Sequence, residues 1–266
     1  MVKHPSLRTP ITYYGGKQKL VSTIVPLIPP HVLYCEPFIG GAAVFFGKEP
    51  SKVEVINDTN KEVVNFYQVV QNRIHDLQLL VKATLHSRDL HDDAYVVYNK
   101  PHLHDEVRRA WAVWVLSTQS FSANLDNSWG YDKKKATTSI KIQNRKNEFT
   151  EELAIRLQNA QIECADALYI IERRDGVDSF FYCDPPYYNS NLGHYNGYGE
   201  QDFENLLKLL SKLKGKFLLS SYPSDLLAKY TAKGKWFTKS IEQRITAAGA
   251  DKKLFKTEVL TANYEI

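Results

Sequence analysis

The feature that most constrains the fold is a short apolar run, residues 180–183, that ends in Asp184-Pro185-Pro186-Tyr187. Such a run is typical of a buried strand, and two consecutive prolines cannot continue the hydrogen bonds of a sheet. A carboxylate, carbonyl groups and an aromatic ring therefore lie at the carboxyl end of a strand, where open α/β sheets bind ligands. Asp184 and the Pro185 carbonyl can accept the hydrogens of a planar amine, such as that of adenine, while Tyr187 stacks on its ring. The alternative is an ordinary turn, because Asp-Pro pairs commonly begin turns.

A glycine-rich turn follows another apolar run. Residues 32–35 precede the stretch 36–41, Glu-Pro-Phe-Ile-Gly-Gly, and glycines let the backbone approach a ligand closely. The next apolar run, 53–56, ends at Asn57-Asp58, and Asp58 follows Gly40 by 18 residues. Nucleotide-binding α/β units place the acid that binds ribose at about this distance. The pattern G-x-G-x-x-G is absent, so nicotinamide and flavin cofactors are not favoured. The turn suits S-adenosylmethionine, which has no pyrophosphate.

A third segment, Tyr13 to Lys17, contains Gly-Gly-Lys but does not match the phosphate-loop pattern. The alternative to a ligand-binding role for Lys17 is an ordinary solvated lysine in a loop. The chain resembles the Dam-like DNA adenine methyltransferases in the order of its motifs. That order is Gly-Gly-Lys, E-P-F-x-G, a strand ending in Asp, the recognition region and D-P-P-Y. Residues 243–264 are similar to the C-terminal strand pair of that family. The resemblance spans nearly the whole chain.

The resemblance implies an α/β fold: a seven-stranded, mostly parallel Rossmann-like methyltransferase sheet with helices on both faces, plus an inserted, mainly helical DNA-recognition domain. The apolar runs agree with seven strands. We expect residues 1–72 and 160–266 to form the catalytic and cofactor-binding domain, and 73–159 to form the target-recognition insert. Apolar periodicity predicts a helix from Val63 through Leu77, and a mostly buried helix over 108–116. A loop or hairpin is expected over 117–142.

The tetrad has the groups that adenine methylation needs. The lone pair of an adenine amino group is delocalised into the ring, so two acceptors on its hydrogens, Asp184 and the Pro185 carbonyl, favour a more tetrahedral and nucleophilic nitrogen. Direct in-line transfer from the sulfonium then needs positioning rather than a covalent intermediate. The target base must first leave the duplex, and stacking on Tyr187 offsets part of that cost. No cysteine follows a proline, so a cytosine-ring nucleophile is not indicated.

The resemblance also assigns cofactor residues. It places the methionine end of S-adenosylmethionine against the Gly-Gly-Lys loop and the glycine turn, the ribose on one acid, and the cofactor's adenine amino group on another. In this chain the residues expected to bind the cofactor are Tyr14, Gly15, Gly16, Lys17, Glu36, Pro37, Phe38, Gly40, Gly41, Asp58, Asp166 and Asp184. For Asp166 the alternative is an ordinary helix cap, and Tyr14 replaces the tryptophan of the family.

Residues 119–131 correspond to the family's DNA-reading hairpin, but they lack its basic, arginine-bearing character, so the family's GATC specificity is not implied. The residues expected to contact DNA are Phe121, Asn124, Asn127, Trp129, Lys133, Lys134 and Lys135. Amide side chains read base edges, apolar rings wedge base steps, and lysines neutralise phosphates without reading sequence. A solvated charged face is the alternative for the lysines.

Composition permits this function without demanding it. The chain has 266 residues, 43% of them hydrophobic, a net charge of +4 and three cysteines without a C-x-x-C pair. We therefore expect no metal, no disulfide framework and no membrane segment. The expected setting is cytoplasmic, for a monomer that acts on double-stranded DNA, with a cognate restriction endonuclease as one option. An RNA adenine methyltransferase and a catalytically silent DNA-binding module are the alternatives to the enzyme.

Overall fold

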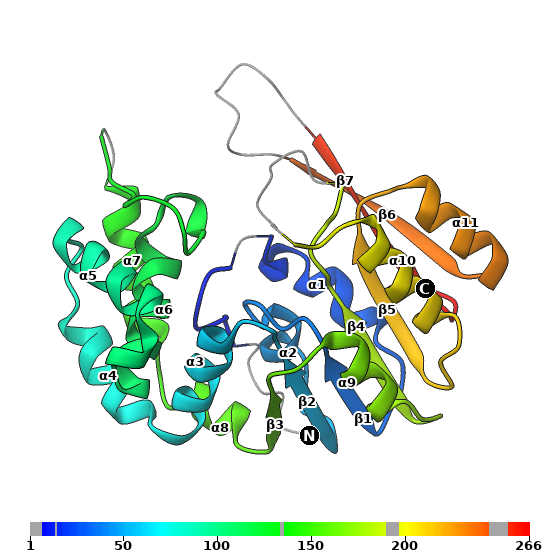
Figure 1. Cartoon of the computed structure of the whole chain (residues 1–266), viewed down its shortest axis with the longest axis horizontal. Coiled ribbons are helices and arrows are strands. Elements are labelled where there is room, and N and C mark those ends of the chain that lie inside the picture. Colours follow the sequence, from blue (N-terminus) through cyan, green and yellow to red (C-terminus); the bar gives the residue numbers. More distant parts are fainter. Residues whose placement is uncertain (1–6, 14, 134–135, 190–196, 245–254) are drawn as a thin grey trace. The chain divides into compact units, whose positions relative to one another are not determined.

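A seven-stranded sheet forms the centre of the fold, with strand order β3-β2-β1-β4-β5-β7-β6 (Figure 1). The computed structural model describes residues 7–13, 15–133, 136–189, 197–244 and 255–266. The strands are β1 Leu33–Glu36, β2 Val53–Asn57, β3 Ala160–Glu163, β4 Ser179–Cys183, β5 Lys216–Ser221, β6 Phe237–Arg244 and β7 Phe255–Ala262. β1 and β5 pair with β4 in parallel, whereas β7 is antiparallel to β5 and β6. The predicted α/β sheet with a helical insert is confirmed.

Helices and short 3-10 turns connect these strands. The helices are α1 Val21–Ile24, α2 Ala43–Gly47, α3 Lys61–Asn72, α4 Ile74–Ala83, α5 Arg88–Asn99, α6 Glu106–Gln119, α7 Thr137–Glu148, α8 Glu152–Leu157, α9 Ala167–Arg174, α10 Glu200–Leu210 and α11 Asp225–Gly234. The 3-10 turns are η1 Lys17–Lys19, η2 Val25–Leu27, η3 Pro101–Leu103 and η4 Phe121–Ala123.

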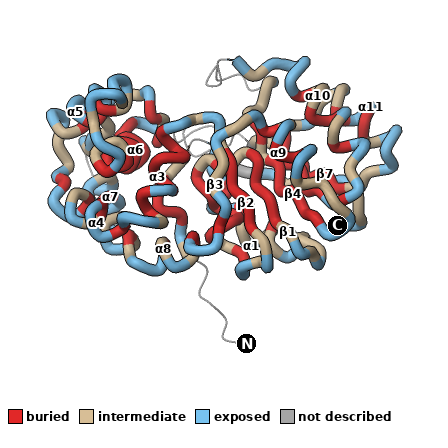
Figure 2. Tube along the Cα trace, turned by 60° about the horizontal axis from the view of Figure 1, so that its bottom comes forward, coloured by how far each residue is buried: buried red, intermediate tan, exposed pale blue. Residues whose placement is uncertain are grey.

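The chain divides into two compact units. The C-terminal unit consists of Leu27–Phe38, Ser51–Val55 and Ala165–Ile266. In it, α9, α10 and α11 bury their apolar side chains against one face of β1, β4, β5 and β7, where Phe181 and Phe217 pack with Val259. Figure 2 shows β4 as a buried strand along its length.

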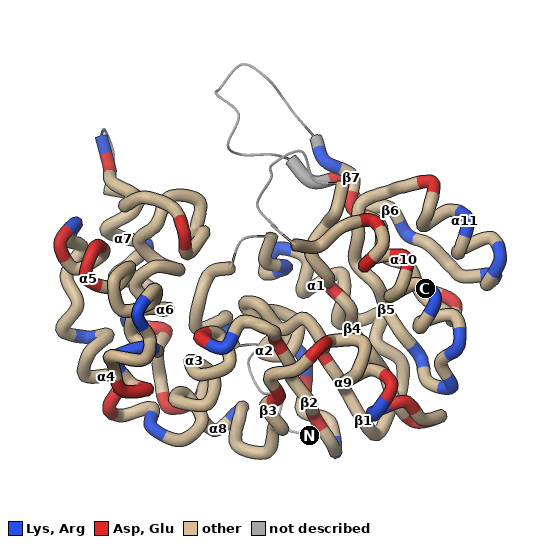
Figure 3. Tube along the Cα trace, in the orientation of Figure 1, with Lys and Arg blue, Asp and Glu red and all other residues tan. Residues whose placement is uncertain are grey.

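The helical unit consists of Met1–Pro26, Ile39–Pro50 and Ile56–Cys164. Helix α6 is its core: α3, α4 and α5 pack around it, and Trp111 and Trp114 are buried. Caps fix the ends of these helices, because the Asn60 side chain accepts from the first backbone N–H groups of α3, and Asp105 does the same for α6. Acidic and basic residues are interspersed on α4, α5 and α6 (Figure 3).

Two predicted elements in this unit were wrong in extent. The expected single helix from Val63 through Leu77 is broken at Arg73, whose φ of −136° ends α3 before α4 begins. Both helices bury apolar residues against α6, so the apolar periodicity runs across the break. The expected loop over 117–142 is also partly helical. Helix α6 continues to Gln119, and α7 begins at Thr137 because Asp132 accepts from two of its N-terminal N–H groups.

Candidate active site

The predicted tetrad lies at the carboxyl end of β4, as the prolines require. Every residue of β4 is buried, Asp184 is half-buried, and Pro185 is buried. Because β1, β4 and β5 are parallel, their carboxyl ends meet at the same edge of the sheet. The Asp184 carboxylate and the Pro185 carbonyl therefore belong to the sheet edge at which α/β proteins bind ligands.

Polar side chains form a buried row beside this edge. By strand register, Glu36 of β1, Tyr182 of β4, Ser220 of β5 and Glu258 of β7 lie on the same face of the sheet, opposite the one that α9, α10 and α11 cover. All four are nearly inaccessible to solvent. Tyr34 donates a hydrogen bond to Glu36, and the Tyr182 and Ser220 hydroxyls lie 2.9 Å apart.

Tyr187 connects the tetrad to this row. Its hydroxyl oxygen lies 2.7 Å from Glu258 Oε1 and 3.1 Å from Asp184 Oδ1. Its ring meets the ring of Tyr222 edge to face, with centroids 4.5 Å apart, and the Lys256 ammonium lies 4.6 Å from the centre of the Tyr222 ring. The Tyr187 ring is therefore fixed at its hydroxyl and along one edge.

The electrostatics keep the phenols protonated. Burial, followed by the charges of Asp184 and Glu258, raises the pKa of Tyr187 well above its ordinary value. Burial and the charge of Asp184 also raise the pKa of Tyr182. Both tyrosines are therefore hydrogen-bond donors at neutral pH. Burial raises the pKa of the Cys183 thiol as well, which makes that cysteine a poor nucleophile.

The other predicted residues of the C-terminal unit lie near strand or helix ends. Pro37 is buried, and Phe38 packs against the apolar core of this unit. Asp166 is exposed and caps α9, where its Oδ1 accepts from the Tyr169 N–H at 3.1 Å. A carboxylate accepts up to about four hydrogen bonds, so a cap does not prevent a ligand contact.

In the helical unit, the glycine turn is closely packed. Gly40 has φ +43°, a left-handed conformation that favours glycine. A Cβ atom at Gly40 or at Gly41 would lie 3.1 Å from the Tyr13 side chain. The Tyr67 hydroxyl donates to the Gly40 carbonyl at 2.7 Å. Tyr13 thus occupies the space that a side chain at either glycine would need.

Asp58 holds the glycine turn from the end of β2. Its Oδ2 accepts from the Gly40 N–H at 3.0 Å, and its Oδ1 accepts from the Asn60 N–H at 2.9 Å. Burial raises the pKa of Asp58, although the backbone N–H groups of Asn60, Gly40 and Thr59 act in the opposite direction. The sequence-predicted pair of glycine turn and acid is therefore in direct contact.

The Gly-Gly-Lys loop is a tight turn in the same unit. The Gly16 N–H donates to the Tyr13 carbonyl at 2.9 Å, and Gly15 has φ +73°. Lys17 is buried and donates to the Gly15 carbonyl at 3.0 Å, so the solvated loop position does not apply to its side chain. Tyr14 lies outside the described residues.

The predicted recognition segment, 119–131, is a closed loop at the end of α6. An antiparallel bridge joins Ser120 to Trp129, and the Phe121 N–H donates to the Ser128 carbonyl at 2.8 Å. Asn127 Nδ2 donates to the Phe121 carbonyl at 2.9 Å, and Asn124 Oδ1 accepts from the Asp126 N–H. Phe121 is 66% exposed.

The Trp129 ring packs against aromatic and cationic side chains. The Arg88 guanidinium lies 4.8 Å from the centre of the Trp129 ring, His86 lies 4.8 Å away, and Tyr131 stacks at 5.7 Å. The ammonium group of the exposed Lys133 lies 5.8 Å from the centre of the Tyr131 ring. Lys134 and Lys135 lie outside the described residues.

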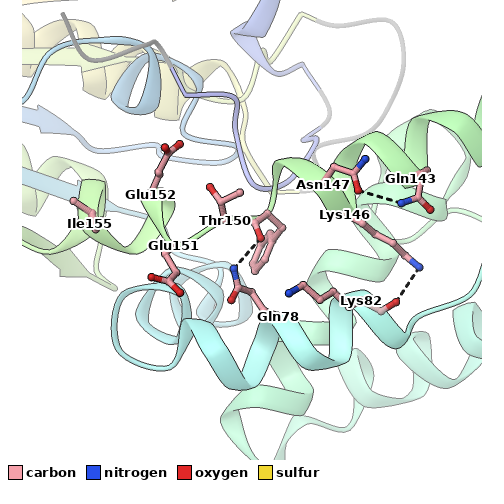
Figure 4. Close-up of a pocket in the computed structure, with 10 residues that line it drawn as sticks. Gln78, Lys82, Gln143, Lys146, Asn147, Thr150, Glu151, Glu152 and Ile155 are labelled. Carbon is pink, nitrogen blue, oxygen red and sulfur yellow. Dashed lines mark hydrogen bonds between the residues drawn. The ribbon is translucent and has the colours of Figure 1, made fainter. Parts of the chain in front are cut away.

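A separate pocket of about 680 Å³ lies in the helical unit between α4, α7 and α8, lined by polar residues that include Gln78, Lys82 and Lys146 (Figure 4). No predicted site residue lines it. Within the described ranges no group of three or more His, Cys, Asp or Glu residues could hold a metal ion. No helix in the same ranges combines the length and the apolar character that crossing a bilayer requires.

Sequence reasoning missed Glu258 and Tyr222, which hold Tyr187, and Tyr13, which packs on the glycine turn. A signal for Glu258 existed, because it is a lone acid followed by an apolar pair near the start of a predicted strand, where a buried carboxylate needs a partner. Its partner lies 71 residues away in the chain, so the sequence pattern could not name it.

Strand order 3-2-1-4-5-7-6 with an antiparallel β7 is typical of S-adenosylmethionine-dependent methyltransferases, and the polar tetrad lies at its ligand-binding edge. The family described as D12 class N6 adenine-specific DNA methyltransferase matches residues 13–248. The chain belongs to this family. It is an S-adenosylmethionine-dependent, adenine-specific DNA methyltransferase, and its substrate is DNA.

Similar proteins cover nearly the whole chain. Type II methyltransferase M1.LlaDCHI of Lactococcus lactis subsp. cremoris is 28% identical over 97% of this chain and 96% of its own length. Type II methyltransferase M.MjaIII of Methanocaldococcus jannaschii is 27% identical, with 96% and 98% covered. The DNA adenine methylase of Escherichia coli (strain K12) is 23% identical, with 96% and 94% covered.

Proposed function

We propose that Asp184, Pro185, Pro186 and Tyr187 hold the target adenine. Asp184 and the Pro185 carbonyl accept the two amino hydrogens, which favours the tetrahedral nitrogen that attacks the methyl group. Pro186 restricts the backbone conformation, and neither proline has an N–H that could compete for the acceptors. Tyr187 presents its ring to the base. The observation that carries this proposal is the half-buried Asp184 beside the anchored Tyr187 at the end of β4.

We further propose which residues bind S-adenosylmethionine, which supplies the methyl group. Gly40 has a left-handed backbone and neither Gly40 nor Gly41 has a side chain, so the backbone of this turn can approach a bulky adenosyl group closely. Asp58 binds the ribose hydroxyls, with acceptor capacity beyond its two backbone bonds. The proposed set is completed by the Gly-Gly-Lys loop with Tyr14, by the stretch Glu36, Pro37 and Phe38, and by Asp166 and Asp184.

Residues 73–159 are proposed as the target-recognition insert, acting on double-stranded DNA. Phe121 is exposed near the closure of the loop, where its N–H donates to Ser128, and wedges the step left by the extruded base. Asn124 Nδ2 and Asn127 Oδ1 read base edges, because their other polar atoms stabilise the loop. Lys133, Lys134 and Lys135 neutralise phosphates. Trp129, whose ring lies 4.8 Å from the Arg88 guanidinium and stacks with Tyr131, is proposed to fill the gap left by the extruded base or to wedge a base step together with Phe121.

The names of two relatives, both type II methyltransferases, support a further proposal. Methylation by this chain protects its recognition sites in DNA from cleavage by a cognate restriction endonuclease. Genomic DNA from cells that express the chain is then resistant to an endonuclease of the same motif. Digestion of that DNA to the extent seen with empty-vector DNA, at every motif that carries the mark, contradicts this role.

Product analysis tests the proposed reaction. The wild-type chain is incubated with labelled S-adenosylmethionine and with duplex DNA, single-stranded DNA or RNA of one sequence, and the nucleosides are separated by mass spectrometry. We expect N6-methyladenine from duplex DNA, at a rate well above that from RNA. Preferred methylation of RNA would favour the RNA methyltransferase, and cofactor binding without transfer to any substrate would favour the silent module.

A further inference from the structure

Glu258 is a buried carboxylate beside the tetrad whose place the roles of the tetrad residues do not explain. β7 runs antiparallel to β5 with Val259 opposite Ser221, so the start of β7 lies at the same sheet edge as the ends of β4 and β5. Residues two apart on a strand share a face, and Lys256 and Glu258 therefore face the same side. Lys256 lies over the Tyr222 ring, and Glu258 meets the Tyr187 hydroxyl.

The Tyr187 hydroxyl lies between two carboxylates but has one hydrogen to give. It lies 2.7 Å from Glu258 Oε1 and 3.1 Å from Asp184 Oδ1. A donation to Asp184 would occupy an acceptor that the adenine amino group needs. The shorter distance favours donation to Glu258, so the Tyr187 hydroxyl does not take an Asp184 lone pair.

We propose that Glu258 is a positioning residue for methyl transfer: it takes the Tyr187 hydrogen bond, which fixes the ring for the target base and keeps the Tyr187 hydrogen away from the Asp184 carboxylate. Glu258 does not touch the substrate. Tyr222 supports the same ring from the side, through its edge-to-face contact. This inference rests on the proposed role of the tetrad and extends it to a residue 71 positions further along the chain.

The test compares two replacements of Glu258 that differ in one property. Glu258→Leu removes the acceptor at similar volume, whereas Glu258→Gln keeps an oxygen acceptor without the charge. We expect Glu258→Leu to slow single-turnover methylation of duplex DNA by at least about 10-fold, since small misplacements of reacting groups cost about this much or more. Glu258→Gln stays within about 3-fold of wild type, and S-adenosylmethionine affinity changes in neither.

A matched control and a coupling experiment separate positioning from simple destabilisation. Glu242→Leu, at an exposed residue of the neighbouring β6, is the control. In a Tyr187→Phe background the residue 187 hydroxyl no longer competes for Asp184, so Glu258→Leu should add less than about 2-fold, because residues that act through one contact are not additive. Thermal unfolding is measured for every variant.

The proposal is overturned if Glu258→Leu matches Glu242→Leu in rate, if its loss is undiminished in the Tyr187→Phe background, or if Gln is as slow as Leu. Should Glu258→Leu not fold, Tyr187→Phe is measured alone, and a wild-type rate there overturns the proposal. Failure of the proposed function looks different, because the wild-type chain itself would then transfer no methyl group to duplex DNA.

Discussion

Asp58 and Asp184 are both carboxylates that follow buried strands, yet their surroundings differ. Asp58 accepts backbone N–H groups on both oxygens, and burial raises its pKa. Asp184 instead lies beside a phenol whose hydrogen a second carboxylate can take. The first environment suits a residue that fixes a turn and binds neutral hydroxyls. The second suits a residue that must offer lone pairs to a substrate amine.

At this scale we predict that Asp58→Ala weakens S-adenosylmethionine binding by roughly 1.5–3 kcal/mol, the size of a charge-assisted hydrogen bond. Asp58→Asn keeps one oxygen acceptor and should lose less. Isothermal titration calorimetry measures the affinity, and thermal unfolding checks that the Gly40 turn survives. Unchanged affinity in a folded Asp58→Ala protein would remove Asp58 from the ribose site.

At the scale of elements, we propose different roles in DNA binding for the closed loop 119–131 and for the lysines that follow it. Hydrogen bonds within the loop, such as Phe121 N–H to Ser128 and Gly130 N–H to Gln119, fix its shape independently of DNA. A loop of fixed shape can present base-reading atoms in one register. In the proposal the lysines neutralise phosphates, which carry no sequence information.

For the loop, we predict that Asn124→Ala alters the methylated motif at one position, at a cost of about 1–3 kcal/mol of discrimination. Activity on a relaxed set of sites should remain. Methylome sequencing of cells that express each variant is the measurement, and Asn144→Ala, on α7, is the matched control. If the Asn124 variant marks the wild-type motif with wild-type selectivity, another surface reads the sequence.

For the lysines, we predict that changing Lys133, Lys134 and Lys135 together to Gln weakens binding to target and non-target duplexes alike. The slope of log affinity against log salt should flatten by about one unit for each phosphate that the variant no longer neutralises. Fluorescence anisotropy at several salt concentrations measures this. Lys212, Lys214 and Lys233, changed in the same way, serve as the control, and an equal slope in both triple variants would mean a solvated face.

The same scale shows what the sequence can and cannot predict. The strands could be predicted from the sequence because apolar runs end at residues that cannot continue a sheet, such as Pro185 after β4. The break at Arg73 could not be predicted, because the apolar residues of the two flanking helices form one continuous pattern in the sequence. Helix α7 has little apolar periodicity, and its start depends on the Asp132 cap. Glu258 was missed because its role comes from strand order, which brings β7 beside β5.

At the scale of the whole molecule, sequence order and strand order place different motifs on neighbouring strands. The strand with the tetrad, β4, comes after the helical insert in the chain but pairs directly with β1, which precedes the glycine turn. The helices α3 to α8 lie between β2 and β3 in the chain, and their insertion leaves the sheet order intact. In the proposal, residues 73–159 of this helical region read DNA and can vary in sequence while the catalytic edge is kept.

The central claim is that Asp184 acts on the target amino group, and single-turnover methylation by Asp184→Ala tests it most directly. The reaction is run on a duplex with one target site and saturating S-adenosylmethionine, alongside calorimetric titration of the cofactor. We predict a rate at least about 100-fold below wild type, as expected for a positioned acceptor, with cofactor affinity within a few-fold. A folded Asp184→Ala protein that keeps more than about a tenth of the rate would contradict the claim.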